Sequence, residues 1–201
     1  MALNFANNNS LSAITTKPSG LSGGIMTLLS TQTASSSATI SFTSGIDSTY
    51  DEYVFKFIDI HPATDEAYLT FQGNAAGGSG YNETITSTDF RAYNAEDGSA
   101  TALQYSTAFD QAQGTSFQPI TQEIGNDNDQ CASGTLQIFA PSDTTFVKHF
   151  LSASQYSWAG DYTMRDFTAG YFNTTSAIDE IQFKMSSGNI DSGVIKLYGI
   201  S

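Results

Sequence analysis

Residues 178–200 show the clearest pattern in the chain, and this pattern most strongly limits how the chain can fold. Apolar and polar residues alternate strictly in 181–185, and the alternation resumes in 193–200. A period of two residues is typical of a β-strand with one buried face. The Ser-Ser-Gly-Asn sequence at 186–189 provides turn residues between the two segments. We therefore predict a β-hairpin that closes a sheet at the end of the chain.

The rest of the chain continues this pattern less regularly. Only 13% of the residues are charged, about half the usual share, which suits a β-protein with polar strand faces and long loops. A glycine-rich loop is expected at 73–79, and residues 101–113 are compatible with a short helix of low propensity. Together with the hairpin, the predicted strands number roughly ten, which indicates an all-β sandwich or barrel. The further strands are expected at 25–32, 37–43, 51–60, 66–72, 117–124, 133–139, 145–153 and 165–173.

The first 24 residues differ in composition from the remainder. Asn-Asn-Asn-Ser and Pro-Ser-Gly sequences surround only a few apolar residues. Such a segment cannot bury enough surface to order itself, so it is either a disordered tail or an arm that folds against a partner subunit. We divide the chain into an extended N-terminal arm, 1–24, and a β-sandwich domain, 25–201.

The strongest apolar run, 51–60, carries apolar residues on both faces of its predicted strand. This indicates either a central strand covered on both sides or a strand that faces another subunit. The candidate assembly interface combines two apolar residues of the arm with three aromatic residues on one face of this strand: Leu11, Ile14, Tyr53, Phe55 and Phe57.

The formal net charge of −13 argues against several partners. Such a surface repels nucleic-acid phosphates and anionic membranes, and no apolar run approaches membrane-spanning length. The acidity is explained by solubility or, alternatively, by a surface that gathers cations. Residues 1–5 lack the features of a secretory signal, and the single Cys131 leaves no internal disulfide.

Three residues are the conventional candidates for catalysis, namely His61, His149 and Cys131. A nucleophilic pair would need the cysteine beside one histidine, and no local signature supports either pairing. Cys131 also has no basic neighbour in sequence to lower its pKa. We therefore expect a protein without enzymatic activity and without an obligatory cofactor.

Segment 125–130, Gly-Asn-Asp-Asn-Asp-Gln, is the best candidate for binding a metal ion. Side-chain oxygens of Asp127 and Asp129 on a tight loop suit Ca²⁺, which prefers several hard oxygen ligands. The segment lacks the glycine and the later glutamate of an EF-hand loop, and Asx-rich turns also form without metal.

Carbohydrate recognition is suggested by 155–162, where aromatic and polar residues lie close together. Tyr156, Trp158 and Tyr162 offer flat faces for a sugar ring, and Asp161 offers a hydrogen-bond partner. The competing interpretation is that these aromatic side chains pack beneath their own loop or into a neighbouring subunit.

Several segments together resemble one group of proteins. Segments 1–10, 30–37, 169–178 and 181–200 resemble virion structural proteins of tailed bacteriophages, especially those of marine phages. The resemblance implies a jelly-roll-like antiparallel β-sandwich and a homo-oligomer, commonly a trimer, assembled with other virion proteins. It implies a protein made in the cytoplasm of a bacterial host and located on the virion, and it supplies no catalytic motif.

The first functional hypothesis is therefore a non-enzymatic virion protein at the tail or fibre that binds a glycan of the host surface. A capsid decoration protein that cements shell subunits is an alternative with the same fold. A soluble carbohydrate-binding module is a second alternative, which requires the segment around Trp158 to be accessible.

Overall fold

A computed structural model describes residues 26–200 of the chain. These residues form thirteen β-strands and no helix, so none of them makes a helix able to cross a membrane. The strands are β1 Met26–Ser37, β2 Ile40–Phe42, β3 Glu52–Pro62, β4 Leu69–Ala75, β5 Ile85–Ala95, β6 Thr101–Tyr105, β7 Ala112–Gly114, β8 Gln118–Pro119, β9 Ala132–Phe139, β10 Lys148–Trp158, β11 Tyr162–Phe172, β12 Ile178–Met185 and β13 Ile190–Ile200. Leu11 and Ile14, and with them the predicted arm, lie outside the described residues.

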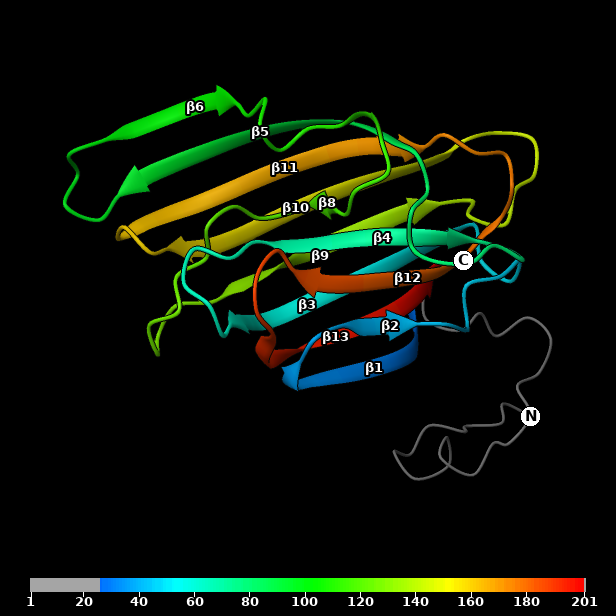
Figure 1. Cartoon of the computed structure of the whole chain (residues 1–201), viewed down its shortest axis with the longest axis horizontal. Helices are drawn as coiled ribbons and strands as arrows, with labels where there is room; N and C mark the ends of the chain where they lie inside the picture. Colours follow the sequence, from blue (N-terminus) through cyan, green and yellow to red (C-terminus); the bar gives the residue numbers. More distant parts are fainter. Residues whose placement is uncertain (1–25, 201) are drawn as a thin grey trace, which may run out of the picture.

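The strands form two antiparallel sheets that pack face to face (Figure 1). The large sheet has nine strands in the order β1-β13-β3-β9-β10-β11-β5-β6, with β7 paired to β5. The small sheet has the order β2-β12-β4-β8. The expected all-β antiparallel sandwich is confirmed, whereas the narrower jelly-roll topology stays a prediction.

Aromatic side chains fill the space between the sheets. Phe42 and Phe183 of the small sheet meet Phe55 of the large sheet edge to face, with ring centroids 5.1 and 5.3 Å from Phe55. Edge-to-face contacts add to the stabilisation that burial of each ring already provides.

The three aromatic residues assigned to a subunit interface belong to this core. Tyr53, Phe55 and Phe57 are each at most 1% exposed, and they face the small sheet of their own chain. The predicted assembly interface at these residues is therefore corrected. The apolar run indicated a covered strand, but the cover comes from within the chain.

The two closing strands are present but do not form a hairpin. β12 pairs with β2 and β4 in the small sheet, whereas β13 pairs with β1 and β3 in the large sheet. The turn at 186–189 carries the chain from one sheet to the other, so Phe183 and Leu197 both point into the core. The alternation predicted one buried face for each strand correctly, but it did not determine which strands lie beside each other.

Four other local predictions also differ from the structure. Residues 101–113 contain β6 and the start of β7 instead of a helix. β4 includes the first three residues of the predicted glycine-rich loop and ends at Ala75, and β1 runs without interruption to Ser37. Of the predicted strand 117–124, only Gln118–Pro119 is a strand. In the first three cases pairing with a neighbouring strand overrides weak local preferences.

The small sheet covers only part of the large one, because β5, β10 and β11 extend beyond it at one end (Figure 1). There the connecting segment 118–124 lies over the inner face, with Gln118, Thr121 and Gln122 almost fully buried. The large sheet presents polar residues to this segment, and their side chains are also buried: Ser87, Asp89, Ser154, Asp166 and Thr168. The interior is thus apolar between the sheets and polar beneath the 118–124 segment.

Candidate functional site

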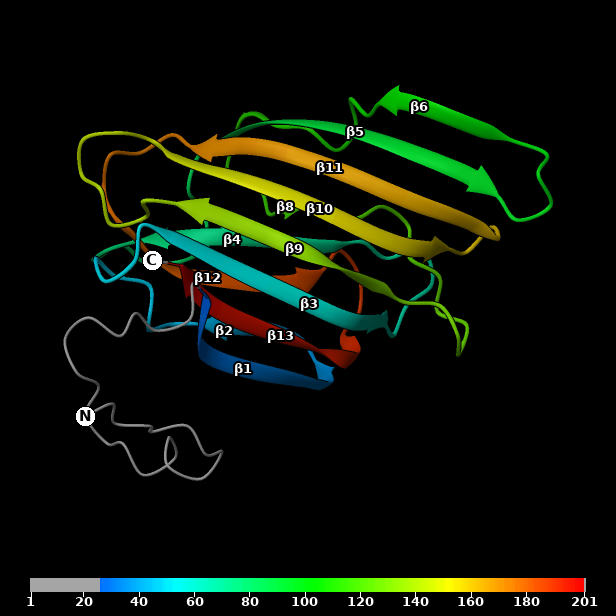
Figure 2. The ribbon, with the colours of Figure 1, turned by 180° about the vertical axis from the view of Figure 1, so that it is seen from behind.

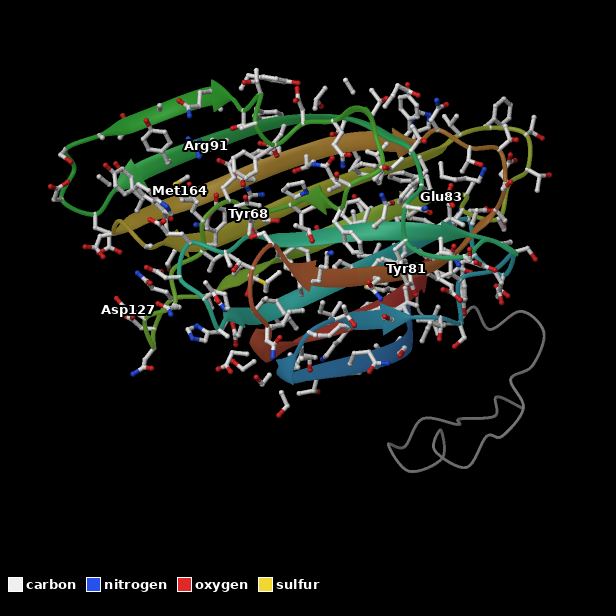
Figure 3. All side chains as sticks on the ribbon, in the orientation of Figure 1. Tyr68, Tyr81, Glu83, Arg91, Asp127 and Met164 are labelled. Carbon is white, nitrogen blue, oxygen red and sulfur yellow. The ribbon has the colours of Figure 1, made fainter. Side chains whose placement is uncertain are left out.

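A pocket opens on the inner face of the large sheet, in the region beyond the small sheet. Figure 3 shows two of its residues, Arg91 on β5 and Met164 on β11, near one end of the long axis of the molecule. Glu83 and Tyr81 lie toward the opposite end. The pocket has a volume of about 170 Å³ and is lined by Arg91, Tyr93, Glu123, Trp158, Tyr162 and Met164.

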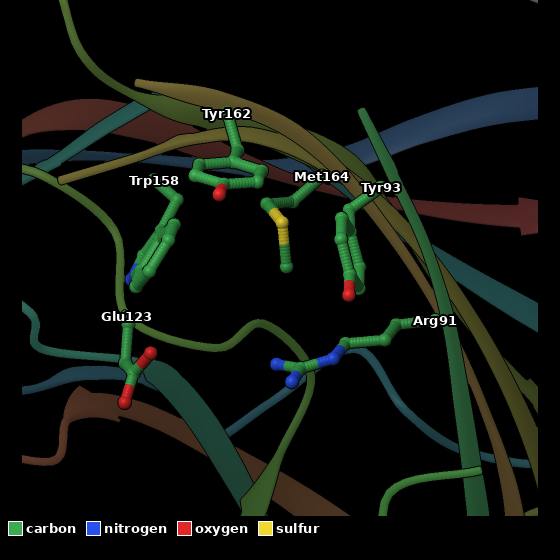
Figure 4. A pocket seen from close by; sticks show the side chains of 6 residues that line it. All are labelled: Arg91, Tyr93, Glu123, Trp158, Tyr162 and Met164. Carbon is green, nitrogen blue, oxygen red and sulfur yellow. The ribbon is translucent and has the colours of Figure 1, made fainter. Parts of the chain in front are cut away.

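Three aromatic residues and a methionine form the apolar wall (Figure 4). The Tyr162 ring lies between the other two aromatic rings, with its centroid 4.8 Å from that of Trp158 and 5.7 Å from that of Tyr93. Met164 lies directly opposite Tyr93 in the register of β11 and β5. These four side chains come from three adjacent strands, so the hydrogen bonds of the sheet fix their spacing.

Two charged residues form the polar wall opposite (Figure 4). Arg91 projects from β5 beneath Tyr93, with its guanidinium carbon 5.8 Å from the centre of that ring. Glu123 lies on the 118–124 segment, where the next residue, Ile124, bridges both Ala67 and Trp158. The pocket therefore has a cationic donor and an anionic acceptor facing its aromatic wall.

Buried hydrogen bonds hold the guanidinium of Arg91 in position. One of its terminal nitrogens donates to the side-chain oxygen of Gln122. The amide nitrogen of Gln122 donates in turn to Asp89 Oδ1 at 3.1 Å and to the Ser106 hydroxyl at 3.0 Å. Thr168 donates to the other oxygen of Asp89 at 2.7 Å. Arg91 is thus preorganised by a network that lies below the pocket.

A second carboxyl group, Asp166, lies in the same buried layer. Its Oδ2 accepts a hydrogen bond of 3.1 Å from the Tyr156 hydroxyl. Its Oδ1 has no partner among the described residues, and neither has the hydroxyl of Ser154, which lies directly opposite on β10.

Burial changes the protonation of this layer. Burial, and after it the nearby Asp89, raise the pKa of Asp166 to about 8, against the opposing effects of Tyr156 and Arg91. Burial also raises the pKa of Asp89, against hydrogen bonds from Thr168 and Gln122 that favour its ionised form. Asp166 therefore keeps its proton near neutral pH, so the layer does not bury two neighbouring negative charges.

The structure brings together two of the four residues predicted to bind carbohydrate. Trp158 and Tyr162 are half-buried and line the pocket. Tyr156 is a correction, because it is 2% exposed and lies in the buried layer with Asp166. Asp161 is exposed and lines a neighbouring hollow together with Glu96 and Tyr162, so its role in binding stays a prediction.

Sequence reasoning missed Arg91, Tyr93, Glu123 and Met164. Arg91 and Tyr93 lie far from Trp158 in the sequence, and the pairing of β5 with β11 brings them beside Met164. The alternation of Asp89, Arg91 and Tyr93 along one strand was the available signal, since three polar or aromatic residues share a face. Glu123 gave no signal, because its position depends on how an irregular segment crosses the sheet.

Two of the conventional catalytic candidates lie in a separate hollow. His61 and Cys131 line it together with Asp59, Asp129 and Asp191. The Nδ1 atom of His61 lies 2.8 Å from the backbone oxygen of Gln130. Burial, together with the carboxylate of Asp59, raises the pKa of the Cys131 thiol, which opposes its activation as a nucleophile. His149 lies elsewhere, against the Tyr171 ring.

The predicted calcium ligands are exposed on their loop. The turn is closed by hydrogen bonds between the backbones of Asp127 and Gln130 and from the Asp127 N–H to the Gln130 side chain. Among residues 26–200, no group of three or more His, Cys, Asp or Glu residues is arranged to hold a metal ion. A calcium site at Asp127 and Asp129 stays a prediction.

Comparisons with known proteins give no further guide to the role of this pocket. Neither the family models, nor the curated proteins, nor the solved structures with which the chain was compared match it.

Proposed function

We propose that the protein is a non-enzymatic structural protein of a bacteriophage particle, at its tail or fibre, that binds a saccharide of the host surface. The pocket lined by Trp158, Tyr162 and Arg91 is the observation that carries the binding part of this proposal. The position on a virion is supported by the resemblance of both ends and the middle of the chain to phage structural proteins.

The chemistry of the pocket suits a sugar better than other small ligands. The apolar C–H face of a pyranose ring packs on aromatic side chains, and its hydroxyls need donors and acceptors at the side. The aromatic packing surface comes from Trp158, Tyr162 and Tyr93. The hydrogen-bond donors come from Arg91, and the acceptors come from Glu123. Because these two charges are opposite, the pocket favours a ligand without net charge.

The size of the pocket limits how much of the ligand it encloses. Its volume of about 170 Å³ is below the ~300 Å³ at which pockets begin to enclose drug-sized ligands. One sugar unit therefore occupies the pocket, while the rest of a polysaccharide chain extends into solvent. We expect weak binding per site and a gain in avidity when several copies bind one surface.

Trp158 provides a direct test, since it is the only tryptophan in the chain and it lines the pocket. The full-length protein is titrated with neutral monosaccharides and with polysaccharide from bacterial surfaces while its fluorescence is recorded. A saturable change in emission is expected with at least one neutral sugar. Glu123→Ala should weaken binding tenfold or more, and Glu96→Ala, an exposed glutamate outside the pocket, should not. If no sugar changes the emission, the binding proposal is wrong.

Location on the particle requires a separate measurement. Cryo-electron microscopy of phage particles that carry this chain should show its density at the tail or fibre. Density spread over the shell would identify a capsid decoration protein instead. Absence of the chain from purified particles, combined with sugar binding, would identify a soluble carbohydrate-binding module.

A further inference from the structure

The outer face of the large sheet has an unusual distribution of charge. Five adjacent strands, β9, β10, β11, β5 and β6, contain only two of the twenty acidic residues, Asp89 and Asp166. Both are buried on the inner side of the sheet. The outer side of these five strands, here called the acid-free face, therefore carries no carboxylate from its own strands. Carboxylates of other segments reach its borders: Asp110 accepts a hydrogen bond from Tyr105 of β6, and at the opposite border Glu52 and Asp59 of β3 accept hydrogen bonds from Gln137 and Ser133 of β9.

The acid-free face also collects exposed apolar side chains. Among residues 26–200, eight large hydrophobic residues are exposed, and four of them lie here: Phe90, Leu103, Tyr105 and Leu151. Phe90 stacks on Phe167 of the neighbouring strand, with ring centroids 5.0 Å apart and planes 17° apart. The only full positive charge on these outer positions is Arg165, whose guanidinium lies 4.8 Å from the centre of the Phe167 ring. A contiguous apolar patch of this kind marks an interaction surface.

The register of the strands shows that these residues share one side. Ala153 pairs with Phe167, Phe167 with Phe90, and Phe90 with Tyr105, so one row crosses four strands. In the next row Leu151 pairs with Ala169. Directly opposed residues point to the same side of a sheet. Figure 2 shows this side of the large sheet without any strand packed over it.

We propose that the acid-free face binds the same face of a second copy of this chain. With net charge −13, two copies repel each other wherever their carboxylates meet. Contact between two acid-free faces brings apolar rows together without opposing carboxylates. A two-fold arrangement of identical patches is the commonest way in which identical subunits pair.

The face is large enough for a stable dimer. Three of the five strands have eleven residues and are about 36 Å long, whereas β9 has eight residues and β6 has five. With strands spaced about 4.8 Å apart, their outer side presents roughly 650 Å². Two copies would therefore bury about 1,300 Å² in total, within the range of specific interfaces. The saccharide pocket opens on the inner side of the sheet, so the pairing leaves it accessible, and this inference does not depend on sugar binding.

The experiment measures the mass of the full-length protein in solution by light scattering after size-exclusion chromatography, over a wide range of concentration. The expected mass is twice the 21.5 kDa of one chain. Leu151→Glu and Phe90→Glu should each halve the mass, because each places carboxylates in the interface. Phe146→Glu makes the same kind of change at an exposed hydrophobic residue in the loop before β10, and it should leave the dimer intact.

A mixing experiment tests whether the two faces meet each other. Leu151→Lys should also be monomeric alone, and equal amounts of Leu151→Lys and Leu151→Glu should restore the dimer mass. Circular dichroism confirms that each variant is folded. A monomeric wild type, a wild-type trimer, or a dimer that persists in Leu151→Glu would each overturn the proposal, because a closed two-fold contact ends at two copies.

Discussion

Trp158 and Tyr162 form the final cross-strand pair of the β10–β11 hairpin, and their rings meet edge to face with centroids 4.8 Å apart. Three residues connect the strands, and the last of them, Asp161, has a φ of 61°. Its N–H donates to the Trp158 carbonyl at 3.0 Å. A left-handed residue at this position is typical of three-residue hairpin loops. The geometry of one short turn thus sets the spacing of two pocket walls.

Removal of the central aromatic wall should abolish most of the proposed sugar binding. Tyr162→Ala deletes the ring that contacts both Trp158 and Tyr93. We expect affinity to fall tenfold or more, equivalent to at least about 1.4 kcal/mol, while Tyr162→Phe keeps the stacking face and loses less. Calorimetric titration with the sugar that binds wild type most tightly measures the affinity of both variants. Tyr171→Ala, on the same strand but away from the pocket, is the control, and an equal loss there would show a general effect on the fold.

A substitution in the turn should disturb the pocket without removing any of its residues. A Cβ atom at Gly160 would lie 2.6 Å from the Trp158 ring, which is closer than real contacts allow. Gly160→Ala should therefore displace the indole, shift its fluorescence in the absence of sugar, and weaken binding. Asn also tolerates a left-handed conformation, and the side chain at 161 lies outside the pocket. Asp161→Asn should therefore change neither the fluorescence without sugar nor the affinity for sugar. Equal effects of the two variants would contradict the geometry described for the turn.

The sequence predicted where strands lie in the chain more reliably than which strands pair with each other. Alternation in 181–185 reports that one face is buried, but the turn residues at 186–189 suit both a hairpin and a passage between sheets. The apolar run at 51–60 likewise indicated cover on its aromatic face, without stating whether that cover is a second sheet or a second chain. Strand order depends on contacts between distant segments, which a local pattern does not contain.

The residues of the candidate site likewise fall into those that a local sequence pattern predicts and those that depend on contacts between distant segments. Trp158 and Tyr162 were predictable because only three residues separate them and both are aromatic. Arg91 and Glu123 depend on the pairing of β5 with β11 and on the path of an irregular segment. Tyr156 was misplaced because strand parity alone does not distinguish a half-buried aromatic at the end of a sheet from a fully buried one in its middle.

The buried carboxyl group should make stability depend on pH. An aspartate in the unfolded chain loses its proton near pH 4, whereas burial and Asp89 raise the pKa of Asp166 in the folded protein to about 8. Between these values the folded state holds a proton that the unfolded state has released. Stability should therefore fall as pH rises through this window, by up to ~1.4 kcal/mol per pH unit.

Asp166→Asn should remove this dependence. Thermal unfolding of wild type should occur at a lower temperature near pH 8 than near pH 5, and the difference should shrink in Asp166→Asn. Glu96→Gln, at an exposed carboxylate, should retain the wild-type difference. An unchanged pH dependence in Asp166→Asn would mean that Asp166 is not the titrating group.

Lys148 is the last residue for which the structure makes a sharp prediction. Its side chain is completely buried, and its ammonium group donates to the backbone oxygens of Phe146, Thr174 and Thr175 at 2.6, 3.5 and 3.3 Å. The ammonium thereby ties the loop before β10 to the loop after β11. Burial lowers the pKa of Lys148, against the opposing effect of Asp143.

Lys148→Met keeps the volume of the side chain and leaves three carbonyl oxygens without this donor. We expect the free energy of unfolding to fall by about 2–4 kcal/mol, measured by denaturant unfolding. Lys196→Met makes the same exchange at a lysine on the outer face of the large sheet, which is not fully buried, and should change stability far less. Equal stability of Lys148→Met and wild type would show that the apolar contacts of the lysine stem, and not its three hydrogen bonds, hold the two loops together.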